Sequence, residues 1–88
     1  MKLIIAILRD TDNDPVSRSL TSAGFRVTCI ASTGGFWRRG QSTLLIGVED
    51  NQLEDALVIL RKTVTKPTET DKSQTTIFVI KVDQFSQF

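Results

Sequence analysis

The stretch DPVSRSLTSAGFRVTCIA, residues 14–31, predicts a helix, a stop and a strand in succession. Asp14 followed by Pro15 is typical of a helix start, because aspartate caps free backbone N–H groups and proline fits the first helical position. Apolar residues then recur at helical spacing, and Gly24 favours a stop. Alternation beyond this glycine predicts a strand over 25–31. One face of that strand carries Phe25, Val27, Cys29 and Ala31, and the other carries Arg26, Thr28 and Ile30.

The residues on either side of this stretch extend the pattern. Residues 3–8 form a continuous apolar run of strand length, which indicates a strand that is covered on both faces. The polar residues 10–13 are expected to form a loop. A further strand is predicted over 42–48, and its connection to the strand at 25–31 is too short for a crossover. These two strands should therefore be antiparallel neighbours.

The second half of the sequence predicts another helix followed by another strand. Asp50 or Asn51 is expected to cap this helix. Its apolar stripe consists of Leu53, Ala56, Leu57, Leu60 and Val64. Residues 65–75 are polar and are predicted to form a loop. The last strand is predicted over 76–82, and a short tail follows it.

The order strand, helix, strand, strand, helix, strand predicts a single α+β domain over residues 1–88, with the ferredoxin-like βαββαβ fold. Two right-handed crossovers would place both helices on one face of a four-stranded antiparallel sheet. The last strand nevertheless carries apolar residues on both of its faces, as do the first and the third. The sheet face without helices therefore needs a partner, and association of identical subunits is the simplest one.

Composition excludes several classes of function. The formal net charge is only +1, so no protein-wide field favours DNA or an anionic membrane surface. The absence of histidine removes His-based acid–base catalysis and most zinc sites, and no enzymatic activity is expected. The run Asp10, Asp12 and Asp14 is followed by a proline and lacks the glycine and the glutamate of a calcium loop, so no metal site is predicted.

The cysteine and the N-terminal apolar run are two further features, and the second indicates a cytoplasmic protein. Cys29, the single cysteine, lies in an apolar run and is expected to be a reduced and buried thiol. The apolar run over residues 3–8 is too short to span a membrane, and no small-residue cleavage site follows it.

The segment TGGFWRRGQ, residues 33–41, combines residue types that suit a nucleotide. Its paired glycines allow close backbone approach to an anion, and its two arginines match phosphate. Phe36 and Trp37 offer flat faces for a purine. Arg26 and Thr28, which share one face of the preceding strand, are candidates for the floor of such a site. A hairpin loop whose aromatic side chains pack on the core, next to a solvated strand face, would explain the same residues without a ligand.

Three segments together resemble the PII-like cyclic-di-AMP receptor family. They are MKLIIAI at 1–7, GFRVT at 24–28 continuing to ASTGGF at 31–36, and IFVIKVDQFSQF at 77–88. The resemblance implies a homotrimer of ferredoxin-like subunits that binds cyclic di-AMP in the clefts between neighbours, without a cofactor or catalysis, and that signals to an effector protein. It implies ligand contacts at Arg26, Thr28, Gly35, Phe36, Trp37, Gln41, Gly47, Phe78 and Gln87.

Trp37, Gln41 and the short loop at 65–75 distinguish this sequence from the family pattern. The family usually has an aliphatic residue at the first position, asparagine at the second, and a much longer loop. A trimer that binds another adenine nucleotide, such as ATP, is therefore a second hypothesis. A third hypothesis is an RNA-binding module that displays bases on its sheet, which the low net charge disfavours, and a fourth is a purely structural trimer.

Overall fold

The computed structural model describes residues 1–32, 40–66, 75–84 and 86, and every element named below lies within these ranges. Strands β1, β2, β3 and β4 span Lys2–Arg9, Arg26–Ser32, Gln41–Val48 and Thr76–Lys81. Helices α1 and α2 span Asp10–Ser22 and Leu53–Thr63, and a 3₁₀ turn, η1, covers Asp50–Gln52. The order of strands and helices is the predicted βαββαβ.

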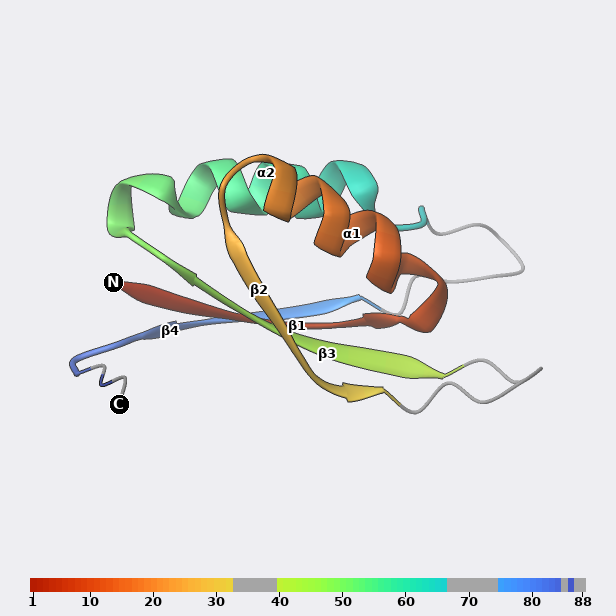
Figure 1. Cartoon of the computed structure of the whole chain (residues 1–88), viewed down its shortest axis with the longest axis horizontal. Helices are drawn as coiled ribbons and strands as arrows, with labels where there is room; N and C mark the ends of the chain where they lie inside the picture. Colours follow the sequence, from red (N-terminus) through yellow and green to blue (C-terminus); the bar gives the residue numbers. More distant parts are fainter. Residues whose placement is uncertain (33–39, 67–74, 85, 87–88) are drawn as a thin grey trace.

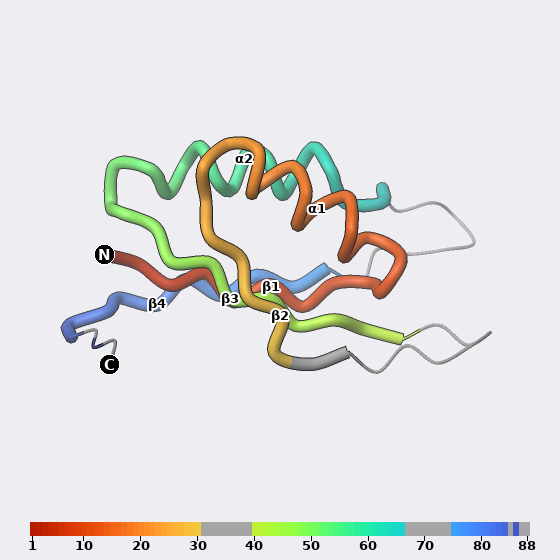
Figure 2. The backbone as a smooth tube through the Cα atoms, viewed as in Figure 1, coloured from red at the N-terminus to blue at the C-terminus, as the bar shows by residue number. Residues whose placement is uncertain are grey.

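The strands within these ranges form one four-stranded sheet in the order β2-β3-β1-β4, with every adjacent pair antiparallel. Helix α1 connects β1 to β2, and α2 connects β3 to β4, so that each helix joins strands that are not adjacent. Figures 1 and 2 show both helices on the same side of the sheet. This arrangement confirms the ferredoxin-like fold. We call the side under the helices the covered face, and the opposite side the open face.

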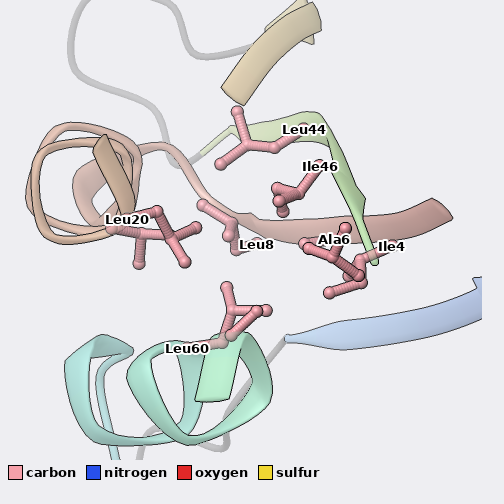
Figure 3. Close-up of a cluster of buried hydrophobic side chains, with 10 residues drawn as sticks. Ile4, Ala6, Leu8, Leu20, Leu44, Ile46 and Leu60 are labelled. Atoms are coloured by element: carbon pink, nitrogen blue, oxygen red, sulfur yellow. The ribbon is translucent and has the colours of Figure 1, made fainter. Parts of the chain in front are cut away.

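Alternate residues of the two central strands fill the space between the sheet and the helices. The buried apolar side chains, each at most 2% exposed, are Ile4, Ala6, Leu8, Val16, Leu20, Leu44, Ile46, Val48, Ala56 and Leu60. Figure 3 shows Leu20 of α1 and Leu60 of α2 pointing toward Leu8 of β1. Because full burial of such a side chain contributes about 1.5–3 kcal/mol, this layer holds both helices on the sheet.

The open face also carries apolar residues, although neither α1 nor α2 covers it. Since successive side chains of a strand alternate, Leu3, Ile5 and Ile7 face away from the helices, and they are only partly buried. Phe78 and Ile80 of β4 pair with Ile5 and Leu3 and are 52% and 45% exposed. The uniformly apolar run in β1 therefore contributes side chains to both faces of the sheet, and the two helices cover one of these faces.

The start of α1 differs from the prediction. The helix begins at Asp10, so that residues 10–13 form its first turn and not a loop, and Asp14 is not the cap. Pro15 consequently lies inside the helix, where its ring removes one backbone hydrogen bond. Side chains of the first turn hold the helix in place: Asp12 is only 4% exposed and makes hydrogen bonds to the segment that follows α2. Tertiary contacts thus outweigh the local capping signal.

The end of α1 agrees with the prediction. Gly24 follows the helix with φ of +94°, a left-handed conformation that a side chain would strain. The Gly24 N–H donates to the Thr21 carbonyl and the Phe25 N–H donates to the Leu20 carbonyl, both at 3.0 Å. These two bonds satisfy carbonyl groups at the helix end and turn the chain into β2.

The cap before α2 was predicted at the wrong residue. Glu49, and not Asp50 or Asn51, forms a reciprocal capping box with Gln52 at the start of the 3₁₀ turn η1. The Glu49 N–H donates to the Gln52 side-chain oxygen at 3.1 Å, and the Glu49 side chain accepts from the Gln52 N–H. Glutamate has a longer side chain than the residues that usually cap helices, and its presence in the sequence is therefore a weak indication of a helix start.

Strand β2 corrects two further predictions. Its register against β3 shifts between Cys29 and Ala31, which interrupts the alternation predicted over 25–31. Cys29 is exposed and not buried. Its sulfur lies 3.7 Å from the side-chain nitrogen of Asn13. The physical reason is the position of β2 at the edge of the sheet, where a strand has one neighbour and keeps contact with water.

Candidate functional site

Arg26 and Thr28 lie together on the open face, as predicted. In the register of β2 with β3, Arg26 pairs with Gly47 and Thr28 pairs with Leu45. Val27 between them pairs with Ile46, which is buried under the helices, so the flanking side chains must face the other way. Both side chains are exposed. The structure therefore places a guanidinium and a hydroxyl beside a glycine on one apolar surface.

Gln41 and Gly47 occupy opposite ends of the same strand. Both lie on the open face, because they alternate with the buried residues Ser42 and Ile46. Gln41 pairs with Arg9 of β1, whereas Gly47 pairs with Leu3. The interval from Gln41 to Gly47 spans about 20 Å along an antiparallel strand. Within one subunit, Gln41 and Gly47 are therefore too far apart to contact the same base.

Phe78 lies across the sheet from Thr28. The two residues belong to one row, in which Thr28 pairs with Leu45, Leu45 with Ile5, and Ile5 with Phe78. They are at opposite edges of the sheet, three strand spacings or about 14 Å apart. The predicted aromatic contact and the predicted polar contact therefore share a face but are not in contact within one subunit.

Four of the predicted contacts lie outside the described residues. They are Gly35, Phe36, Trp37 and Gln87. The strands that flank the first three are described: β2 ends at Ser32 and β3 begins at Gln41. Residues 33–39 therefore connect the two strands that carry Arg26, Thr28 and Gly47.

Met1 was not singled out from the sequence, yet it lies at this surface. A Cβ atom added to Gly47 would be 3.4 Å from the Met1 methyl carbon. The Met1 carbonyl accepts a hydrogen bond from the Val82 N–H at 3.1 Å, and the Met1 amino group lies 3.1 Å from the Asp50 carboxylate. The hydrogen bond that this amino group donates to Asp50, together with its positive charge, lowers the pKa of the Asp50 carboxyl.

The first turn of α1 anchors the chain where it leaves α2. Asp12, which is almost fully buried, accepts hydrogen bonds from the Thr65 N–H at 3.1 Å and from the Thr65 hydroxyl at 2.6 Å. A buried carboxylate with two donors is satisfied where it stands. No pattern in the sequence indicated this role, because Asp12 was expected to belong to the polar loop over residues 10–13.

The same turn also anchors the start of β3. The Asp10 N–H donates to the Gly40 carbonyl at 3.0 Å, and the Asp10 carboxylate accepts from the hydroxyl of the fully buried Ser42. Asn13 donates to that hydroxyl oxygen at 3.2 Å. This cluster sets the position of the first residues of β3, among them Gln41.

Two features are absent from the described residues. Among them, no group of three or more histidine, cysteine, aspartate or glutamate side chains is placed to hold a metal ion. Neither α1 nor α2, the two helices of the described ranges, is both long and apolar enough to cross a bilayer.

Two comparisons with known proteins bear on identity. A crystal structure of a functionally unknown protein from Pediococcus pentosaceus ATCC 25745 superimposes with a TM-score of 0.79 at 32% sequence identity, over 99% of this chain and 96% of that chain. The family model described as cyclic-di-AMP receptor matches residues 1–70. That match covers most of the chain, including β1, β2, β3 and both helices. The chain therefore belongs to the cyclic-di-AMP receptor family.

Proposed function

We propose that this protein is a non-enzymatic signal-transduction protein that binds cyclic di-AMP in clefts between the subunits of a homotrimer. The observation that carries the proposal is the placement of Arg26 and Thr28 beside Gly47 on an open, apolar sheet face. A guanidinium there meets the requirement of a phosphodiester, since it offers several N–H donors and a permanent charge. The family of the chain supports the choice of ligand.

Two observations support sites between subunits. The open face exposes Phe78 and Ile80 by about half, and exposed apolar surface of this kind favours association with a second copy. Within one subunit, Phe78 is about 14 Å from Thr28 across the sheet. Packing of open faces would bring the aromatic edge of one subunit toward the polar edge of the next. A single ligand could then contact both.

The predicted residues divide into three chemical roles in this proposal. Arg26 binds a phosphate or a base edge, while Thr28 and Gln41 hydrogen-bond a base. Phe36, Trp37 and Phe78 pack against the purines, as Gly35 and Gly47 permit close approach of the ligand. Gln87 contributes from the tail. Ligand binding would favour one arrangement of the surface that an effector protein contacts, without any chemical step.

Isothermal titration of the purified protein with cyclic di-AMP, ATP and cyclic di-GMP tests the proposal. We expect saturable binding near one cyclic di-AMP per subunit, in a protein that is trimeric by light scattering. Arg26→Ala should abolish this binding, because it removes the charge that meets the phosphate. Arg18→Ala is the matched control, since Arg18 is an exposed arginine of α1, on the helix side.

Three different results would contradict the proposal, each in its own way. Tighter binding of ATP than of cyclic di-AMP would contradict the choice of ligand. Salt-sensitive binding of RNA by a monomer would contradict the trimeric receptor. A trimer that binds no nucleotide at all would be a structural assembly, and the proposed function would be wrong.

A further inference from the structure

We propose that the Met1 side chain is part of the ligand site and forms the surface on which a purine packs beside Gly47. This inference rests on the proposed function, and it adds a residue that is not among the ligand contacts implied by the family resemblance.

The position of the Met1 methyl group is the first observation. Met1 is two residues before Leu3, and alternate residues of an extended chain point to the same face, so the Met1 side chain extends over the open face. There the Met1 methyl carbon lies over Gly47: a Cβ atom added to this glycine would be 3.4 Å from it. The backbone of Met1 is held from the other side by the hydrogen bond from the Val82 N–H. Met1 is 39% exposed, so a ligand can reach its side chain.

The second step concerns the approach to Gly47. A ligand that contacts the α-carbon of Gly47 from the open face comes to the place where the Met1 methyl lies. It must therefore pack against the thioether or displace it. Packing is favourable for a purine, because the polarisable thioether makes attractive contacts with flat ring systems. A Cβ atom at position 47 would be in ordinary van der Waals contact with the Met1 methyl group, so the glycine leaves room chiefly for the ligand.

The composition of the chain provides a direct test. Met1 is the single methionine of the sequence, so methyl-¹³C-methionine labelling produces one methyl signal in a ¹H–¹³C correlation spectrum. We expect cyclic di-AMP to move this signal upfield, as a purine face shields the methyl group. The signal should follow the same saturation curve as the heat of binding. In Arg26→Ala protein the signal should not move.

Two outcomes of this titration separate the inference from the function on which it rests. Heat of binding without movement of the Met1 signal overturns the inference and leaves the receptor function intact. Absence of both heat and movement overturns the proposed function, and the inference with it.

A pair of variants on β3 tests the same contact from the side of the glycine. Gly47→Ala adds a methyl group in van der Waals contact with the flexible end of Met1, so the sheet should stay folded while the surroundings of the Met1 methyl group change. We expect the methyl signal of the free protein to shift and the affinity for cyclic di-AMP to fall about twofold to tenfold. Thr43→Ala is the control, because Thr43 lies on the same strand and face but at the other end. An unchanged affinity in Gly47→Ala, with the methyl signal displaced, would overturn the inference.

Discussion

Both faces of the sheet carry apolar residues on the two central strands, but they differ in what covers them. On β3, Leu44 is fully buried under the helices, whereas its neighbour Leu45 is only partly buried on the open face. On β1, Ile4 and Ile5 show the same contrast. The comparison teaches that an apolar strand face predicts a partner without identifying it. The chain supplies the partner for the covered face, and we propose that other subunits supply it for the open face.

The neighbouring leucines of β3 provide the largest expected difference. Leu44→Ala removes a fully buried side chain and should lower the free energy of unfolding by about 2–5 kcal/mol, through lost burial and the cavity that remains. Leu45→Ala should lower it by clearly less at subunit concentrations where the protein is monomeric, because Leu45 is already partly exposed. Urea denaturation of both variants measures the two values. Equal losses would contradict the contrast between the faces.

A charge on the open face should change assembly and leave folding intact. Phe78→Glu replaces a half-exposed aromatic residue, so the subunit should keep its circular dichroism spectrum. Sedimentation should then show monomers, because a carboxylate buried between subunits would lack a partner. Val79→Glu is the control: Val79 is 43% exposed and is the next residue on the opposite face of β4. If Phe78→Glu protein sediments as the unmodified protein does, the open face is not the subunit interface.

The polar anchor between α1 and the segment that follows α2 should have an intermediate effect. Asp12→Ala leaves the Thr65 N–H and hydroxyl without their acceptor and should cost about 1–3 kcal/mol in thermal or urea unfolding. Amide exchange at Thr65 should accelerate. The exposed Asp14 is the matched control, and Asp14→Ala should change stability by less than about 0.5 kcal/mol. Equal behaviour of the two variants would show that the buried anchor does not stabilise the fold.

The smallest effect is expected at the exposed ion pair between the Met1 amino group, just before β1, and Asp50 of η1. Because this partner lowers the pKa of the Asp50 carboxyl, the pair stabilises the fold above the ordinary aspartate pKa of 3.8, and this contribution is lost as the pH falls through the lower folded-state value. Thermal unfolding of Asp50→Asn should therefore differ slightly from the unmodified protein at pH 7 and converge with it in acid. A difference that grows in acid would contradict the assignment.

The order of elements could be predicted from the sequence because it depends on local signals. The apolar run of β1, the stop at Gly24 and the stripe of α2 each indicate an element without reference to the rest of the chain. Two of the wrong predictions depend on tertiary structure, which such local signals do not report. Asp12 belongs to a helix because it is anchored to Thr65, and Cys29 is exposed because β2 is an edge strand.

The candidate site was predictable in part for the same reason. Alternation along β2 placed Arg26 and Thr28 on one face, and the structure agrees. Which residues lie opposite them depends on the register of β2 with β3, and this sets Gly47 beside Arg26. The contact between Met1 and Gly47 joins distant parts of the chain, and no local pattern encodes it.

Subunit mixing tests the central claim, that one ligand contacts the polar edge of one open face and the aromatic edge of another. Arg26→Ala and Phe78→Leu proteins, each first shown to be trimeric and deficient in cyclic di-AMP binding, are unfolded, mixed in equal amounts and refolded together. Our account predicts that the mixture regains tight binding at about a quarter of its sites, because each cleft needs one intact residue from each of two neighbours. A mixture that binds no better than the two proteins apart would contradict it.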